Sequence, residues 1–353
     1  MKSIMHRPSL LADPDILATI HDLPEPRFDH LLRMTDHVGV WEHARYTTPR
    51  PDCGYCTDDN ARALIVMCRE PGPSAELVGL SRTYFRFVVD SALPEGGFHN
   101  RRGVDESWED KIGSEDSQGR AIWALGTAAR RAPEKWMRRA ALEVFQQQQH
   151  FRSCAPRANA FAILGASEVL SEDPAHAMGL NAMAEWAGQL HVSDDREWPW
   201  PEPRLAYDNA RIPEALIAAG AALGRDQLVE AGLHVLDWLM TVETNDSYYS
   251  FTPVGGWARG EPRPGYDQQP VETAAMADAC ARAWELTGHD KWRDGVLSAA
   301  RWLVGRNDGK TLLYDFETGG CCDGLTSSGP NLNQGAESTL SALSTLQQAR
   351  TVA

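Results

Sequence analysis

Two adjacent aspartates at a predicted helix start are the first residues in this chain that could do acid–base chemistry. Residues 55–64 read YCTDDNARAL, with polar residues directly ahead of a small and apolar run. Such residues accept the free backbone N–H groups of a first helical turn, so a helix is expected to begin here. Capping needs one acceptor and the pair Asp58–Asp59 supplies two. We therefore interpret the pair as a candidate site, with capping alone as the competing interpretation.

The same design of a polar start followed by a small-residue run recurs along the chain. The further copies are DSQGRAIWALG at 116–126, RANAFAILG at 157–165, YDNARIPEAL at 207–216, DQQPVETAA at 267–275 and NQGAESTL at 333–340. The six copies lie roughly 40 to 65 residues apart, which is typical of repeated supersecondary units.

Longer amphipathic segments separate these polar starts. Apolar residues follow helical spacing over residues 77–93, 134–150, 176–190, 226–242 and 291–304. Inner helices rich in Ala, Gly and Ser that alternate with outer amphipathic helices predict an all-α (α/α)6 toroid. The inner helix N-termini would converge on one face of it. A first helix is expected over 28–37, and strand signals are confined to loops such as 248–251.

Composition sets the limits of domain count and partner class. The 353 residues carry a formal net charge of -15, which argues against nucleic acid or an anionic membrane as partner. No Gly/Ser linker divides the chain, so we predict one barrel domain over 28–353, preceded by an irregular, proline-punctuated arm at 1–27. No signal peptide or run of about 20 apolar residues is present. A cytoplasmic location is expected, and the seven cysteines are then expected to be thiols.

The loops ahead of the inner helices combine aromatic, arginine and carboxylate side chains. Examples are GGFHNR at 96–101, EWPWPE at 197–202 and GGWAR at 255–259. Aromatic faces that stack on sugar rings, beside groups that bond hydroxyls, form carbohydrate subsites, so an oligosaccharide or glycoconjugate is the predicted ligand. The residues predicted to bind it are His43, Tyr46, His99, Arg101, Trp198, Trp200, Trp257, Asp267, Gln268, Gln269, Glu272, Asn333 and Glu337.

The repeated pattern resembles the six-hairpin glycosidase superfamily. The motifs GYCTDDNARAL at 54–64 and GYDQQPVE at 265–272 resemble a bacterial domain found alone or fused behind retaining glycosyltransferases. This similarity runs from about residue 28 over nearly the whole chain. It implies the toroid and a carbohydrate substrate, but it transfers no catalytic assignment. The sequence shows no nucleotide-sugar-binding α/β domain, so a glycosyltransferase is a candidate partner instead of the activity.

Glycoside hydrolysis is the function that these residues favour. It needs one carboxylic acid to protonate the leaving oxygen and one carboxylate to act as base or nucleophile. The predicted catalytic residues are Asp58 and Asp59, facing Glu115, Asp116 or Asp208, with Glu272 and Glu337 next. Arg62, Arg120 and Arg211 recur inside the inner helices, where buried ion pairs and substrate contacts are equally good interpretations.

Three alternatives remain open at this stage. A sugar epimerase of the N-acylglucosamine 2-epimerase kind shares the toroid, but it uses histidines on inner helices that here begin with Asp, Asn, Gln and Glu. A non-catalytic glycan-binding module serving a glycosyltransferase is the second. Cys53-x-x-Cys56 and Cys321-Cys322 suggest zinc, as in lanthionine cyclases, but the Cys-His-Gly pattern of those enzymes is absent. We predict no metal and no cofactor.

Overall fold

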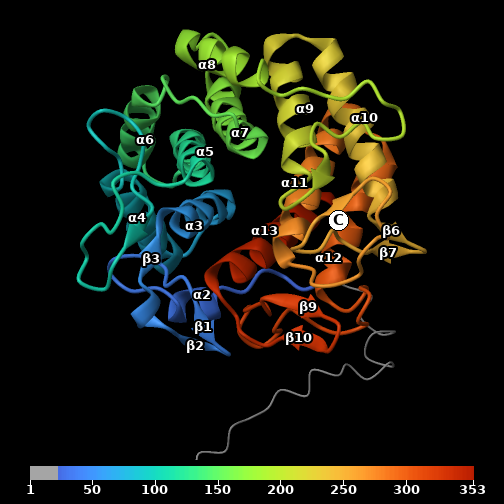
Figure 1. Cartoon of the computed structure of the whole chain (residues 1–353). Helices are drawn as coiled ribbons and strands as arrows, with labels where there is room; N and C mark the ends of the chain where they lie inside the picture. The colour runs from blue at the N-terminus through green and yellow to red at the C-terminus, as the bar shows by residue number, and fades with distance from the viewer. Residues whose placement is uncertain (1–22) are drawn as a thin grey trace, which may run out of the picture.

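A closed ring of six inner helices forms the centre of the protein. The computed structural model describes residues 23–353. The inner helices are α3 (Thr57–Arg69), α5 (Glu115–Arg131), α7 (Pro156–Glu172), α9 (Arg211–Leu223), α11 (Pro270–Thr287) and α13 (Ala336–Val352). Each contacts the next in this order, and α13 contacts α3, which closes the ring (Figure 1).

An outer layer of amphipathic helices covers this ring. It consists of α4 (Ala75–Asp90), α6 (Lys135–Gln147), α8 (Ala177–Ala187), α10 (Asp226–Val242) and α12 (Asp290–Leu303), and each packs on the inner helix that precedes it. The predicted all-α (α/α)6 toroid is confirmed, and the outer helices lie within a few residues of their predicted ranges. No helix between residues 23 and 353 is long and apolar enough to cross a membrane.

The N-terminal part of the chain differs in detail from its prediction. The helix expected over 28–37 is the short α2 (Asp29–Arg33), which contacts α13. Of the predicted N-terminal arm, residues 1–22 lie outside the described residues. The remaining residues 23–27 contain neither helix nor strand.

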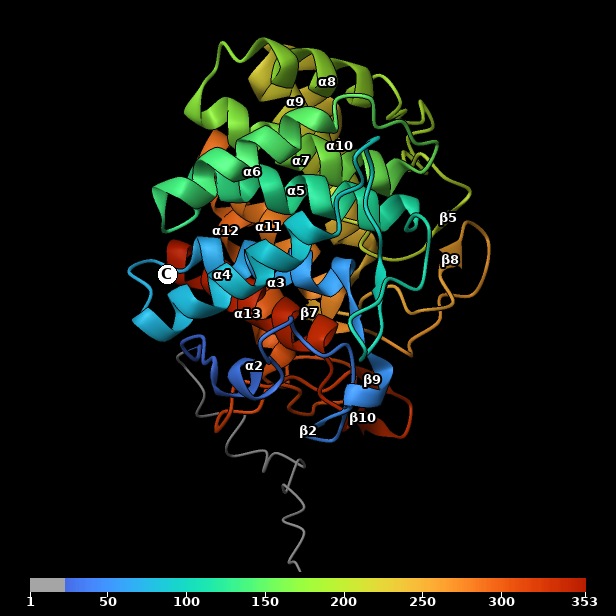
Figure 2. The same cartoon turned by 90° about the vertical axis from the view of Figure 1, so that its left-hand side faces the viewer.

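The strands are short and lie in the segments that lead into inner helices. They pair as antiparallel hairpins or ribbons: β1 (Ala44–Arg45) with β2 (Thr48–Pro49), β3 (Tyr55–Cys56) with β4 (Arg101–Arg102), β5 (Arg204–Leu205) with β8 (Trp257–Ala258), β6 (Thr244–Asn245) with β7 (Tyr248–Tyr249), and β9 (Gly324–Thr326) with β10 (Gly329–Asn331). A single 3-10 turn, η1 (Pro51–Cys53), precedes β3 among the described elements. These segments gather at the end of the barrel opposite the C-terminus of α13 (Figure 2). We call that end the mouth, because the inner helix N-termini open there.

Small residues allow the inner helices to approach closely. A Cβ added at Gly126 in α5 would clash with the backbone carbonyl of Gly165 in α7, and one at Gly165 would clash with α5 in return. These glycines are therefore required by backbone contact between neighbouring inner helices.

Gly126→Ala should destabilise the fold, because the added methyl group has no room between α5 and α7. Overpacking of this kind costs about 1–3 kcal/mol or more. Gly79→Ala in α4 is the matched control, since its added Cβ meets no atom within 4 Å. Removing a helix glycine in open space should raise stability by up to about 1 kcal/mol. Urea denaturation midpoints measure both variants, and equal shifts would contradict the close-approach argument.

Candidate active site

Three carboxyl groups surround the guanidinium group of Arg62 at the mouth. Arg62 Nη1 lies 2.6 Å from Asp58 Oδ2 and 2.9 Å from Asp59 Oδ1, and Nη2 lies 2.7 Å from Glu337 Oε2. Asp58 and Asp59 occupy the first turn of α3, three and four residues before Arg62, so they share its helix face. Glu337 comes from the first turn of α13. We call these four residues the Arg62 cluster.

Arg120 of α5 connects the Arg62 cluster to the loop before α9. Its Nε lies 2.8 Å from Asp58 Oδ1, and its Nη1 lies 2.8 Å from Asp208 Oδ2. These are close charge contacts, and within the described part of the chain Arg120 Nε, Asp58 Oδ1 and Asp208 Oδ2 have no well-aligned hydrogen-bond partner. The guanidinium carbon of Arg120 also lies 4.0 Å from the centre of the Phe161 ring.

The ion pairs continue from Asp208 towards the other end of the barrel. Arg211 Nε lies 3.3 Å from Asp208, and Arg211 Nη1 lies 2.8 Å from Glu214 and 2.5 Å from Asp278. Asp278 in turn accepts from Arg69 Nη1 at 2.8 Å. Alternating arginines and carboxylates therefore run through the inside of the ring. Of the two interpretations open for Arg62, Arg120 and Arg211, the structure shows the ion pairs.

Burial sets the protonation of the cluster. It raises the pKa of Asp59 to about 7; Arg62 opposes this rise, while Asp58 and Glu337 add to it. Asp208 behaves in the opposite way. Burial alone would raise its pKa, but the charges of Arg120 and Arg211 outweigh burial and lower the pKa below its ordinary value. The mouth thus contains a carboxyl group that exchanges its proton near neutral pH.

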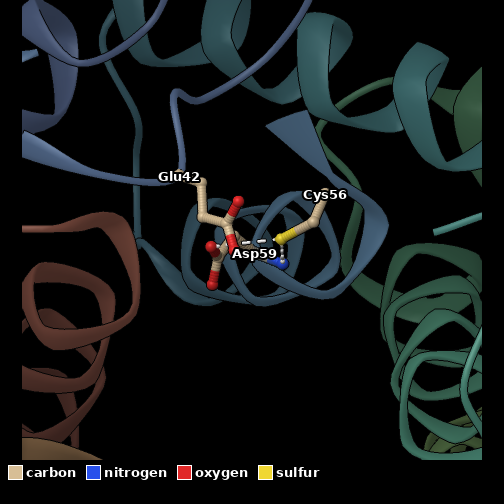
Figure 3. A group of neighbouring side chains, drawn as sticks. All are labelled: Glu42, Cys56 and Asp59. Atoms are coloured by element: carbon tan, nitrogen blue, oxygen red, sulfur yellow. Dashed lines mark hydrogen bonds between the residues drawn. The ribbon is translucent and has the colours of Figure 1, made fainter. Parts of the chain in front are cut away.

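A side-chain group beside Asp59 has the composition of a metal site. One ligand atom each from Glu42, Cys56 and Asp59 lies within 4.8 Å of the others (Figure 3). The Cys56 thiol donates to Asp59 Oδ2 at 3.2 Å, and burial raises its pKa well above the ordinary value. A protonated thiol is a poor metal ligand. The remaining cysteines of the zinc interpretation, Cys53, Cys321 and Cys322, do not join this group.

The other carboxylates predicted to be catalytic lie apart from the Arg62 cluster. Glu115 is exposed at the start of α5, and Asp116 accepts from the hydroxyl group of Tyr207. Glu272 is buried, accepts from the backbone N–H groups of Asp208 and Asn209, and has its pKa raised by burial. Glu272 therefore holds the loop before α9 in place. The structure brings together Asp58, Asp59, Asp208 and Glu337. Glu272 contacts this group only through the backbone N–H of Asp208, and no ion pair joins Glu115 or Asp116 to it among the described residues.

Four of the residues predicted to bind substrate are buried, namely Glu272 and the three described next, and we correct those predictions. Trp200 is 1% exposed and donates from Nε1 to the carbonyl of Arg204 at 3.1 Å. Gln268 is fully buried, and its Oε1 accepts from Trp302 Nε1 at 3.1 Å. Trp198, 8% exposed, packs edge-on against the ring of Trp238. These side chains anchor the loops. The two indoles can be buried in this way because a tryptophan whose N–H has a hydrogen-bond acceptor packs as an apolar side chain does.

The remaining predicted binding residues have varied surroundings in the loops. Trp257 is partly exposed and packs against Trp198, Asp267 is exposed, and Gln269 is partly exposed. Asn333 accepts from the backbone N–H of Tyr46 at 3.0 Å. His99 stacks on Trp108 with ring centres 5.0 Å apart, and its Nδ1 lies 2.7 Å from the Asp110 carbonyl. Arg101 binds Glu42, and His43 Nε2 lies 3.7 Å from Glu42.

Three tyrosines, together with the 38% exposed Phe316, provide exposed aromatic surface in the loops that lead into inner helices. Tyr46, Tyr207 and Tyr266 are 53%, 42% and 38% exposed. Only Tyr46 was among the predicted residues. The missed tyrosines directly precede Asp208 and Asp267, so their position next to two polar helix starts was the available signal. Glu42, which contacts both Arg101 and His43, was also missed, because it lies in a loop with no motif.

Comparison with known proteins supports the fold and leaves the family open. No protein-family model matches the chain, and no curated protein matches it. A sugar epimerase from a ruminal bacterium is 13% identical with a TM-score of 0.71, over 92% of this chain and 95% of that one. The cellobiose 2-epimerase of Spirochaeta thermophila is 13% identical with a TM-score of 0.70, over 93% and 94%.

A third solved structure comes from a glycosidase. An inactive variant of the α-1,6-mannanase GH76A of Salegentibacter sp., with two consecutive aspartates changed to asparagine, was solved with α-1,6-mannotriose. It is 10% identical with a TM-score of 0.59, over 92% of this chain and 96% of that one. At such low identities these structures show a shared (α/α)6 fold.

Proposed function

We propose that the chain is a carbohydrate-active enzyme that hydrolyses a short oligosaccharide at the Arg62 cluster. The observation that carries this proposal is the cluster itself, in which three carboxyl groups share one guanidinium group and one of them has a pKa of about 7. Glycoside hydrolysis needs a proton donor and a carboxylate on either side of the scissile bond. An apolar, buried environment is what keeps a carboxylic acid protonated near neutral pH.

Exposure assigns roles within the cluster. The side chains of Asp58 and Glu337 are 23% and 39% exposed, whereas that of Asp59 is 5% exposed. The Asp58–Asp59 pair is the acid in this proposal. Asp59 is the member that is protonated near neutral pH, and Asp58 is the more exposed member, from which the proton reaches the leaving oxygen. Glu337, on the other side of the guanidinium group, is the carboxylate that receives a proton from the attacking water. The water oxygen bonds to the anomeric carbon as the bond to the leaving oxygen breaks.

The mannanase comparison supports this assignment. The inactive variant of that enzyme lost two consecutive aspartates, and Asp58–Asp59 is the consecutive pair at the start of α3 here. Because the inner helices of this fold bring their N-termini to one mouth, such a pair is placed where an oligosaccharide can enter. Tyr46 and Tyr207 offer exposed aromatic faces for sugar rings.

The setting of this activity is also part of the proposal. The resemblance of residues 54–64 and 265–272 favours a glycosyltransferase as partner. A cytoplasmic location is also proposed, which suits a chain with seven cysteines as thiols. Residues 28–353 would act as one domain, since no linker sequence divides them.

Sugar epimerisation is the second candidate. It is favoured by the TM-scores of 0.71 and 0.70 to two epimerases, against 0.59 to the mannanase. Epimerisation at a reducing end needs a base that removes a carbon-bound proton, for which histidine is the usual residue. In the loops near the mouth, His43 and His99 are the histidines to consider, and His99 already uses Nδ1 with Asp110.

Incubation with a panel of glucose- and mannose-containing di- and trisaccharides in D₂O tests the proposal. Hydrolysis should release new reducing ends without deuterium on carbon. Deuterium incorporated at C2, with no bond cleavage, would overturn hydrolysis and establish epimerisation. Saturable binding without either reaction would leave the glycan-binding module as the function. Asp58→Asn is the matched variant, and product from it at the wild-type rate would refute the role assigned to Asp58.

A further inference from the structure

A cavity lies at the end of the barrel opposite the mouth. Its volume is about 670 Å³, within the range of small-molecule sites. All six inner helices contribute to it, mostly from their C-terminal halves, with Arg69, Arg130, Glu168, Glu214, Arg282 and Arg350 among the lining residues. Glu214 is the exception, since it lies in the first turn of α9. The Arg62 cluster is not part of this lining. The cavity is therefore separate from the proposed active site.

The cavity is rich in arginine although the chain as a whole is acidic. Five arginines line it, Arg69, Arg130, Arg131, Arg282 and Arg350, together with the four carboxylates Glu168, Glu214, Asp278 and Glu285. The whole chain has a formal net charge of -15. Arginines in the last turn of a helix stabilise its C-terminal dipole, which accounts for one such residue per helix. It does not account for two in α5, or for Arg282, which lies more than a turn before the end of α11.

Several N–H groups in this cavity have no partner. Arg130 and Arg131 share one oxygen of Glu168, each at 2.9 Å, and within residues 23–353 Arg131 uses only its Nε. Among the described residues, Arg282 makes a single long contact of 3.4 Å with Glu214, and its buried Nε finds no hydrogen-bond partner there. A guanidinium group has five N–H donors arranged to bind two oxygens at once. These arginines can therefore bind a further anion without giving up Glu168 or Glu214.

Three of the four carboxylates of the cavity, Glu168, Glu214 and Asp278, pair with arginine, and the fourth, Glu285, is exposed. Burial alone would raise the pKa of Glu168, but Arg131, Arg69 and Arg130 outweigh it and hold the pKa below its ordinary value. Asp278 is bound by both Arg69 and Arg211. An anion that enters the cavity therefore meets carboxylates that are largely paired, and N–H groups of Arg131 and Arg282 that are available as hydrogen-bond donors. Phosphate suits these donors because it accepts several charge-assisted hydrogen bonds at once.

We infer that this cavity binds a small phosphate-bearing molecule, held by Arg130, Arg131 and Arg282. Its volume exceeds what a phosphate ion alone fills, so the ligand would be an organic phosphate such as a phosphorylated sugar, with the partly buried indole of Trp284 as a lining surface. The inference does not depend on the proposed hydrolysis, because the residues and the end of the barrel are different.

Isothermal titration of the whole chain at low ionic strength tests this inference. The probes are glucose 6-phosphate, inorganic phosphate and glucose. Glucose 6-phosphate should bind saturably, and Arg131→Gln and Arg282→Gln should each weaken its binding about tenfold, as expected when one charge-assisted contact is lost. Arg86→Gln, an exposed arginine of the outer helix α4, should bind as the wild type does. Equal affinity for inorganic phosphate, with the same sensitivity to the variants, would support the site with the free ion as its ligand.

Two results would overturn the inference. One is an absence of saturable binding of either phosphate, and the other is binding that Arg131→Gln and Arg282→Gln leave unchanged. Melting temperatures establish that the variants fold. Arg131→Lys is a second variant for the case in which Arg131→Gln unfolds. It keeps the charge beside Glu168 and loses the two-pronged donor, so it should bind several-fold more weakly than the wild type.

Discussion

Asp58→Asn should lower kcat/KM for the hydrolysed oligosaccharide by about 10³-fold, since acid–base groups contribute about 10²–10⁴-fold. The change keeps the size of the side chain and removes the carboxyl group through which the proton leaves the cluster. The variant should still fold, because Arg62 retains its ion pairs with Asp59 and Glu337, and Arg120 retains its ion pair with Asp208. Release of reducing ends measures the effect. Asp90→Asn, at the exposed end of the outer helix α4, is the control.

The pH profile of the same reaction provides a second readout. If the protonated form of Asp59 is the active one, kcat/KM should fall as the pH rises through about 7, where Asp59 loses its proton. Asp59→Asn should remove this falling limb together with most of the activity. A wild-type profile that rises through pH 7, or an Asp58→Asn variant with more than half of the wild-type activity, would refute the assignment.

The helices could be predicted from the sequence because their signals are local. The range predicted for α10, 226–242, is the observed one, and the polar starts at Asp58 and Asp116 mark the first turns of α3 and α5. Alternation of small-residue and amphipathic helices then restricts the packing to a double ring. The contacts that close the ring, between α13 and α3, are long-range, but they follow once six helix pairs are assigned.

The partners of the carboxylates could not be predicted in the same way. Arg62 lies three and four residues from Asp59 and Asp58, a spacing that predicts contact along one helix. Its third partner, Glu337, is 275 residues away, and only the closed ring brings it near. Trp198 and Trp200 show the opposite error. A proline-rich loop suggested exposed sugar platforms, whereas both indoles fold under the loop and donate to its backbone carbonyls.

Asp208→Asn should destabilise the protein by about 3–5 kcal/mol, because it leaves two buried guanidinium groups without their shared partner. Asp208 is fully buried and lies 2.8 Å from Arg120 and 3.3 Å from Arg211. Its φ of 51° is one that Asn also tolerates, so the substitution tests charge and not backbone strain. Asp237→Asn is the control. It breaks the half-exposed ion pair with Lys291, which should cost at most about 1 kcal/mol.

Urea unfolding at several pH values separates the charge of Asp208 from its packing. The pKa of Asp208 in the folded protein is lowered from its ordinary 3.8, so the stability that it provides is complete above about pH 4 and is lost as the pH falls through the folded pKa. The difference between the wild type and Asp208→Asn should therefore stay constant from pH 5 to 8 and shrink in more acidic solution. A difference no larger than that of Asp237→Asn, or one that grows below pH 4, would mean that the line of alternating charges through the ring is dispensable. In that case the geometry around Asp58 would have to come from packing of the inner helices alone.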